Sequence, residues 1–264
     1  MLINLWSTPR TGSVWTSIRL LNESRELGNE THLMTEMFNR WHMDVYRVVE
    51  AGSVRNVHQY ESGSYYVNYS LDERGVIKQD KVYAPRSRDI ESEEQHRIEI
   101  INSCDINVCT LILHNHTSPL ATGVYEKLCA VASRNIYIGR KSISQQLASY
   151  GVAMATREFA RFKDSTVPLN ANDWNLRPDH KSLEQLTERV LNWMSLVDID
   201  NDEVLWYEKL DFSKSYPGST VKQNRVNPLL RLHPDTREYI RDCEDHFRNR
   251  LYEITLSKKS PLCP

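Results

Sequence analysis

The sequence predicts an α/β fold in which a mainly parallel sheet is covered by helices on both faces, forming three layers. Short apolar segments alternate with segments of helical periodicity at both ends of the chain, a pattern typical of strands joined by helical crossovers. The chain has 264 residues, of which 40% are hydrophobic, so it can bury a sizeable core. We expect one domain spanning residues 1–264.

Five segments are predicted to be strands of this sheet. Each is short and apolar and is followed by polar residues, which suits strands buried on both faces. They are Leu2–Trp6, His32–Thr35, Asn107–Leu113, Asn135–Ile138 and Val204–Tyr207.

Helices are expected between these strands. Two serine–glutamine pairs match the capping-box pattern of a helix start: Ser92 with Gln95, and Ser182 with Gln185. Apolar residues recur at helical spacing from Leu183 to Val197. Pro234 suits the first turn of a last helix that reaches about Tyr252, and residues 257–264 are expected to form a loose tail.

Two segments do not fit the strand–helix alternation. Residues from about 41 to 90 form an insertion between the second and third strands, and its strand-like runs flank a turn at Asp72–Gly75. This pattern predicts a hairpin or lid-like insertion. The polar segment Asp164–Lys181, which carries two prolines, predicts a mobile loop.

Charge and composition restrict the possible partners. Lys and Arg (33) nearly balance Asp and Glu (35), and the net charge is -2, so a general electrostatic grip on nucleic acid is not expected. The five cysteines lack CxxC or zinc-type spacing, which predicts neither a disulfide framework nor a metal site. No segment approaches the roughly 18 apolar residues of a membrane span. We expect a soluble, cytoplasmic protein. The sequence predicts no particular oligomeric state.

The stretch "NLWSTPRTGSVWTSIRLL" predicts a strand, a glycine-containing turn and a helix. Such a turn brings backbone N–H groups and the positive end of the helix dipole to one point. Gly12 permits close approach of the backbone, Thr11 and Ser13 offer hydroxyl donors, and Arg10 supplies a forked cation. The loop therefore predicts a phosphate or sulfate site. It lacks the lysine and second glycine of GxxxxGK[ST], which disfavours magnesium-dependent triphosphate hydrolysis.

The segment "TPRTGSVW" resembles the 5'-phosphosulfate loop of the sulfotransferases, P-[KR]-[ST]-G-[ST]-x-[WL]. The matched positions are Pro9, Arg10, Thr11, Gly12, Ser13, Val14 and Trp15. The resemblance implies a P-loop-like fold and a sulfuryl donor, 3'-phosphoadenosine 5'-phosphosulfate (PAPS), with 3'-phosphoadenosine 5'-phosphate (PAP) as product and no metal. It also implies that Trp15 stacks on the adenine, although a core position on the first helix is the alternative.

A second segment, "IYIGRKSISQQLASYG", resembles the motif with which the family binds the donor's 3'-phosphate. Arg140 and Ser149 are the implied phosphate ligands. Their spacing matches bacterial relatives that read R-R-x-x-x-x-Q-x-x-S, with Lys141 in the second basic place and Gln146 at the glutamine. Arg140 is preferred, and Lys141 stays open as the alternative.

Two later segments extend the resemblance. "EVLWYEKLDF" resembles the family's late-strand "YEDL", which is mostly structural. Lys222 and Arg225, in "TVKQNRVN", fall where the family places a basic loop over the nucleotide. A solvated loop is the alternative reading of these two residues.

Two residues compete as the general base that takes the acceptor's proton. Glu36, in "HLMTEMFNRW", resembles the glutamate of [ST]-E-x-F-N in bacterial sulfotransferases and is preferred. His116, in "LILHNHTSP", resembles the histidine of K-T-H-x-P in cytosolic members, with His114 in place of the lysine. The alternatives are a surface carboxylate paired with Arg40 and a loop histidine bound to backbone.

The resemblance implies a sulfotransferase that moves a sulfuryl group to a hydroxyl or amine of an unidentified small-molecule, carbohydrate or peptide acceptor. Arg10 would stabilise the leaving phosphate. A P-loop kinase is one alternative, and it requires a magnesium-binding aspartate after a core strand, whereas Asp198 and Asp200 end an apolar helix. A non-catalytic nucleotide-binding module is the other.

Overall fold

The computed structural model describes most of the chain. The described residues are 1–38, 47–50, 53–56, 65–83, 90–105, 107–114, 122–156, 158–161, 174–214, 216 and 227–259. Within them, none of the helices is long and apolar enough to cross a membrane.

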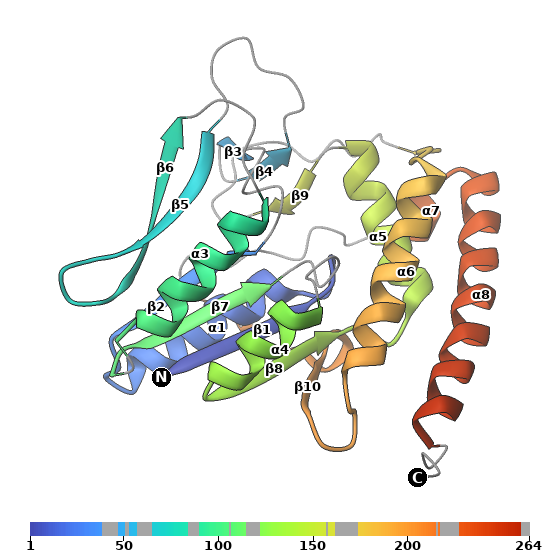
Figure 1. Cartoon of the computed structure of the whole chain (residues 1–264). Helices are drawn as coiled ribbons and strands as arrows, with labels where there is room; N and C mark the ends of the chain where they lie inside the picture. The colour runs from blue at the N-terminus through green and yellow to red at the C-terminus, as the bar shows by residue number, and fades with distance from the viewer. Residues whose placement is uncertain are drawn as a thin grey trace.

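A five-stranded parallel sheet forms the centre of the molecule (Figure 1). Its strands are β1 (Leu2–Ser7), β2 (Thr31–Thr35), β7 (Cys109–His114), β8 (Arg134–Gly139) and β10 (Glu203–Trp206). Their order across the sheet is β10-β8-β1-β7-β2. The five predicted strands and their parallel arrangement are thus confirmed.

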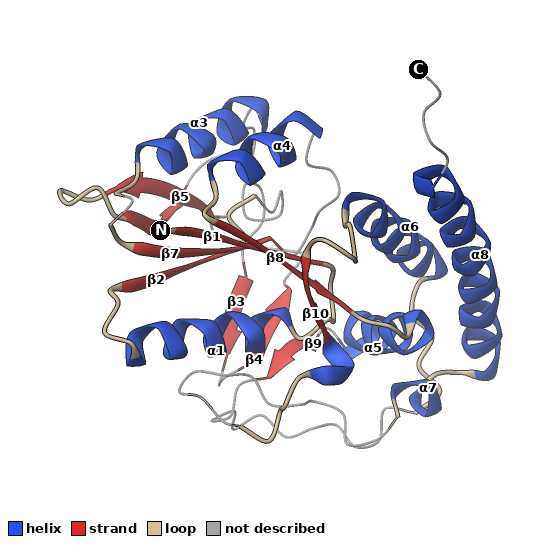
Figure 2. Cartoon of the chain, turned by 90° about the horizontal axis from the view of Figure 1, so that it is seen from below, coloured by secondary structure: helices blue, strands red, loops and turns tan. Residues whose placement is uncertain are grey.

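Helices cover both faces of the sheet (Figure 2). Helix α1 (Ser13–Glu26) lies on one face, and α3 (Ile90–Ser103) and α4 (Thr122–Val131) lie on the other. Strand β1 is buried along its whole length. Leu2 and Trp6 join the core that includes α3 and α4, whereas Ile3 and Leu5 join the core on the α1 side. Burial on both faces explains the continuous apolar run of this strand.

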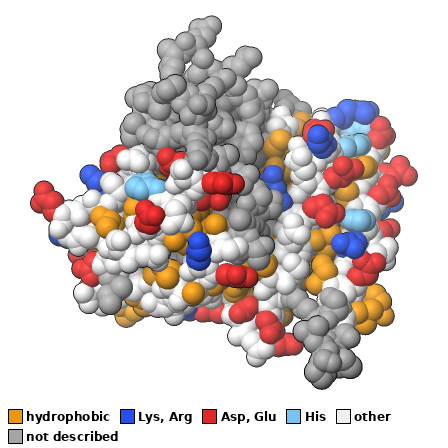
Figure 3. Space-filling model, viewed as in Figure 1, with side chains coloured by type: hydrophobic (Ala, Val, Ile, Leu, Met, Phe, Trp, Pro, Cys, Tyr) orange, Lys and Arg blue, Asp and Glu red, His pale blue; other side chains and the backbone are white. Residues whose placement is uncertain are grey.

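Four helices extend the fold beyond the β10 edge of the sheet (Figures 1 and 2). They are α5 (Ile143–Thr156), α6 (His180–Leu196), α7 (Pro228–Arg231) and α8 (Pro234–Lys259), and they share a third apolar core. Over α6 and α8, acidic and basic side chains are interspersed on the surface (Figure 3).

Three helix boundaries differ from those predicted. Helix α6 begins at His180, because the Asp179 carboxylate caps the N–H groups of Lys181 and Ser182, so Ser182 lies inside the first turn. Helix α3 begins at Ile90, which likewise places Ser92 inside it. Helix α8 runs to Lys259, past Tyr252 and into the expected tail, because no helix breaker intervenes before Pro261.

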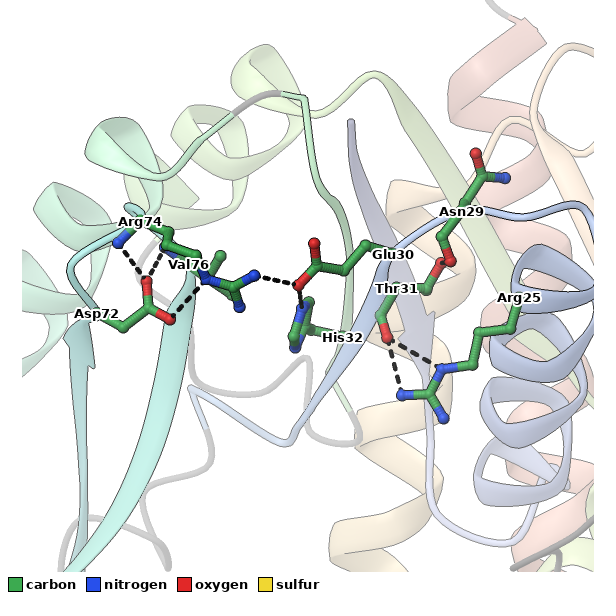
Figure 4. A network of polar contacts seen from close by, with 8 residues as sticks. All are labelled: Arg25, Asn29, Glu30, Thr31, His32, Asp72, Arg74 and Val76. Atoms are coloured by element: carbon green, nitrogen blue, oxygen red, sulfur yellow. Dashed lines mark hydrogen bonds and ion pairs between the residues drawn. The ribbon is translucent and has the colours of Figure 1, made fainter.

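The insertion contains the predicted hairpin. Strands β5 (Tyr65–Leu71) and β6 (Ile77–Tyr83) pair in antiparallel register, and the Asp72 carboxylate accepts hydrogen bonds from the N–H groups of Arg74 and Val76 in the turn. The Arg74 guanidinium also lies 2.9 Å from the Glu30 carboxylate, beside the start of β2 (Figure 4). The turn of the hairpin is therefore tied to the sheet near the amino end of β2.

A small three-stranded sheet links the insertion to the segment after α5. Its strands are β3 (Arg47–Glu50), β4 (Ser53–Asn56) and β9 (Glu158–Arg161), in the order β3-β4-β9. Of the predicted loop 164–181, residues 164–173 lie outside the described residues, and His180 and Lys181 belong to α6.

Candidate functional site

The candidate site lies at the carboxyl ends of β1 and β8, where the chain order across the sheet reverses. After β1 the chain continues to β2 on one side, whereas after β8 it continues to β10 on the other side. Open α/β sheets bind ligands in the crevice outside such a switch point. The opening loop, Thr8–Gly12, follows β1, and α5 follows β8, so both phosphate motifs predicted from the sequence begin at this edge.

The opening loop has a backbone that only a few residue types adopt easily. Gly12 caps α1 with φ 74° and carries no side chain to occupy the first N–H groups of the helix. A Cβ at this position would lie 3.1 Å from side-chain atoms of Leu210 and Phe212. The buried Thr11 hydroxyl donates to the Thr8 carbonyl at 2.9 Å. Glycine is therefore required both by conformation and by space.

Side-chain hydrogen bonds join the opening loop to α5. Arg10 Nε donates to Ser149 Oγ at 3.0 Å, and Gln146 Nε2 donates to the Pro9 carbonyl at 2.7 Å. The residues concerned lie about 140 positions apart in the sequence. The structure thus brings together the two motifs that the sequence analysis proposed separately.

Arg140 follows β8 directly and is mostly buried, with 11% of its side chain exposed. Its Cζ lies 4.3 Å from the ring centroid of Tyr207, a cation–π contact. Glu208 Oε1 lies 3.9 Å from Arg140 Nε. Burial has the largest effect and lowers the pKa of Arg140 below its ordinary value, although the neighbouring Tyr207 and Glu208 act in the opposite direction. The guanidinium is thus held against an aromatic ring with a carboxylate beside it.

Glu208 also binds the start of α5. Its carboxylate accepts hydrogen bonds from the N–H groups of Lys141 at 3.1 Å and Ser142 at 3.3 Å. This third motif, expected from the sequence to be mostly structural, also contacts Arg140, which was not predicted. A signal was present, because β10 and β8 are neighbours and Trp206 pairs with Gly139, so the residues that follow each strand meet at one edge.

Lys141 and Trp15 occupy different surroundings. Lys141 is exposed, and its Nζ lies 5.8 Å from the Trp206 ring centroid. Trp15 is only 2% exposed, and its ring packs against Phe212 and Tyr216. These contacts correspond to the core position considered for Trp15. Ser13 and Val14 form the first turn of α1 behind the loop.

Glu36 follows β2 and is buried, with 3% of the residue exposed. Its backbone has φ 55°, and its N–H donates to the Leu113 carbonyl. The alternative of a surface carboxylate is therefore wrong. The next carbonyl, that of Met37, accepts a hydrogen bond from the fully buried Arg97 of α3. Sequence reasoning missed Arg97, since a charged helical residue usually marks a solvated face.

His114 ends β7, between the strands that carry Arg10 and Glu36. Asn4 donates through Nδ2 to the Leu128 carbonyl, so its Oδ1 faces His114 Nε2 at 3.1 Å, and the imidazole carries its proton on Nε2. The ring stacks on Trp6 with centroids 4.2 Å apart. Burial lowers the pKa of His114 to about 3. This histidine is a neutral core residue and carries no positive charge of the kind that a lysine would supply.

Four residues singled out from the sequence lie outside the described residues: Arg40, His116, Lys222 and Arg225. Comparison of the chain with protein-family models, with curated proteins and with solved structures gave no match.

Proposed function

We propose that the protein is a metal-independent sulfotransferase that takes a sulfuryl group from PAPS. The hydrogen bond between Arg10 and Ser149 carries the proposal, because it joins the loop proposed for the 5'-phosphosulfate to the helix proposed for the 3'-phosphate. PAPS carries anionic groups on both the 5' and the 3' position of its ribose, so its binding site needs two anion-binding positions side by side. The N–H groups of Lys141 and Ser142 before α5 bind the Glu208 carboxylate, so the proposed ligands of the 3'-phosphate are the Arg140 and Ser149 side chains.

Backbone strain also supports a functional role for this edge. Among the described residues, the non-glycine residues with positive φ are Arg10, Glu36 and Asn175. Such conformations are costly and concentrate at functional sites. Two of the three are residues proposed here for binding and catalysis.

In the proposed reaction the acceptor oxygen or nitrogen attacks the sulfur of PAPS, and the bond from sulfur to the 5'-phosphate oxygen breaks. Glu36 takes the acceptor's proton, and Arg10 with the N–H groups of the opening loop stabilises the negative charge on the departing PAP. One strand, β7, separates β1 from β2, so the two residues follow strands roughly 10 Å apart. His116 is the alternative base.

The kinase alternative has no support from the aspartates considered for it. Asp198 and Asp200 lie in the turn that precedes β10. In a parallel sheet this turn is at the amino edge, opposite to the opening loop. These two carboxylates therefore do not reach a phosphate bound at the opening loop.

The proposal is tested by calorimetric titration of the metal-free protein with PAP and with AMP, which lacks the 3'-phosphate. Arg10→Ala is expected to weaken binding of both ligands, and Arg140→Ala to weaken PAP binding selectively. Each lost charge-assisted contact costs about 1.5–3 kcal/mol, roughly ten- to a hundredfold in affinity. Arg248→Ala, on exposed α8, is the matched control. Absence of PAP binding by the wild type, or binding indifferent to both arginines, overturns the proposal.

A further inference from the structure

Gln146 makes an oriented contact with the opening loop from inside the protein. The residue is fully buried on α5. Its Nε2 donates to the Pro9 carbonyl at 2.7 Å and to Thr8 Oγ1 at 2.8 Å. A carbonyl oxygen only accepts hydrogen bonds, so the amide orientation is fixed, with its nitrogen toward the loop. Gln146 Oε1 is buried and has no hydrogen-bond partner within the described part of the chain.

This contact fixes the peptide that precedes Arg10. In a planar trans peptide the N–H group points away from the carbonyl. Because the Pro9 carbonyl points at Gln146, the Arg10 N–H points away from α5. Arg10 itself has φ 69°, a left-handed conformation that is unfavourable for a residue with a Cβ. The hydrogen bond from Gln146 stabilises the turn in which this conformation occurs.

The Arg10 side chain is anchored to the same helix face. Ser149, which accepts from Arg10 Nε at 3.0 Å, is three residues after Gln146, and residues at this spacing share one face of a helix. Hydrogen bonds with α5 residues thus hold both the backbone before Arg10 and the guanidinium of Arg10.

We propose that Gln146 is a positioning residue, which sets the direction of the Arg10 guanidinium without touching the bound anion. The inference rests on the proposed function, in which Arg10 binds the phosphate groups of PAPS and PAP. It adds a residue that acts only through Arg10.

The test is a double-mutant cycle of wild type, Gln146→Leu, Arg10→Ala and the double variant, titrated with PAP. Gln146→Leu is expected to weaken PAP binding about tenfold in the wild-type background. In the Arg10→Ala background it is expected to change binding by less than about twofold, because the group that it positions is gone. Equal loss in both backgrounds overturns the proposal. Gln146→Asn serves as the variant if Gln146→Leu does not fold.

A matched control separates positioning from general destabilisation. Thr187→Val removes another buried hydrogen bond, from Thr187 Oγ1 to the Leu183 carbonyl at 3.0 Å in α6. It is expected to leave PAP affinity unchanged. Loss of affinity in this variant comparable to that in Gln146→Leu overturns the proposal.

Hydrogen–deuterium exchange provides a readout that needs no ligand. Gln146→Leu is expected to raise deuterium uptake in a peptide covering residues 8–12, relative to wild type and Thr187→Val. A wild type that does not bind PAP overturns the proposed function, and the exchange experiment then decides the positioning role by itself. Unchanged exchange in the loop overturns that role.

Discussion

The Arg140 guanidinium lies over the Tyr207 ring, 4.3 Å from Cζ to the ring centroid. The same ring also lies against the opening loop, since a Cβ at Gly12 would lie 3.2 Å from Tyr207 Cδ2. One aromatic side chain is therefore next to both the loop proposed for the 5'-phosphosulfate and the arginine proposed for the 3'-phosphate.

Replacing Tyr207 with leucine is expected to weaken PAP binding more than AMP binding. The change removes a cation–π contact worth about 0.5–2 kcal/mol, or roughly two- to thirtyfold in affinity, and it releases the arginine proposed for the 3'-phosphate. Calorimetric titration of Tyr207→Leu with both ligands measures the difference. Tyr207→Phe keeps the ring and should bind PAP like the wild type, and an equal loss in both variants would contradict the prediction.

Gly12→Ala is expected to destabilise the protein more than Gly28→Ala. Both glycines have positive φ, 74° and 81°, but a Cβ at Gly28 meets nothing within 4 Å. Each variant incurs a conformational cost of about 1–2 kcal/mol, and Gly12→Ala adds overpacking of about 1–3 kcal/mol against three side chains. Urea denaturation measures the free energy of unfolding of both variants, and the difference between their losses is the packing contribution at Gly12. Equal losses in the two variants would contradict the prediction.

Acid is expected to reduce the free energy of unfolding through His114. Burial holds the pKa of this imidazole at about 3, below its ordinary 6.5. Above pH 6.5 the side chain is neutral in both folded and unfolded chains and has no effect. As the pH falls from 6.5 toward 3, only the unfolded chain binds the proton, so stability is lost at up to about 1.4 kcal/mol per pH unit.

The measurement for His114 is denaturant unfolding at several pH values between 7 and 5. His114→Gln retains a donor toward Asn4 but does not titrate, so its stability should depend less steeply on pH. Carboxylates elsewhere in the chain contribute equally to the pH dependence of stability in the variant and in the wild type. Parallel pH profiles for the variant and the wild type would show that His114 is not the group responsible.

Arg97→Met is expected to lower the free energy of unfolding by about 3–5 kcal/mol, because it removes a fully buried cation that lies beside the Glu93 carboxylate. Arg97 is fully buried, lies over the Tyr69 ring at 4.7 Å and has its Nε 3.8 Å from the Glu93 carboxylate. Chemical denaturation checks the value. Arg97→Lys, which keeps the charge, should lose less, and Arg248→Met on the surface should change little. Loss in Arg97→Met no larger than in the surface variant contradicts the prediction.

The sequence predicted the sheet better than the site. Strands such as β1 and β7 are buried on both faces, so their apolar runs are visible without any tertiary information. The start of α6 was misplaced because Asp179 and Ser182 are both good capping residues, and only the backbone geometry shows which one caps.

Within the candidate site, the resemblance proposed Arg10, Arg140 and Ser149 but gave no indication of which side chains contact one another. The Arg10–Ser149 hydrogen bond depends on how α5 packs beside the opening loop, and this follows from tertiary structure alone. Arg97 could not be found from the sequence, because its burial depends on the hairpin residue Tyr69 packing above it.

The pairing of β1 has a consequence for the order in which the chain folds. Leu2 pairs with Thr110 of β7, and Ile3 pairs with Arg134 of β8, so both neighbours of the first strand are encoded far downstream. Ribosomal synthesis delivers β1 before both of its neighbours, yet β1 must wait for them, and closure of such long loops is slow. The opening loop that follows β1 is therefore made early and assembled late. A growing chain folds this loop against α5 only after β8 and α5 have left the ribosome.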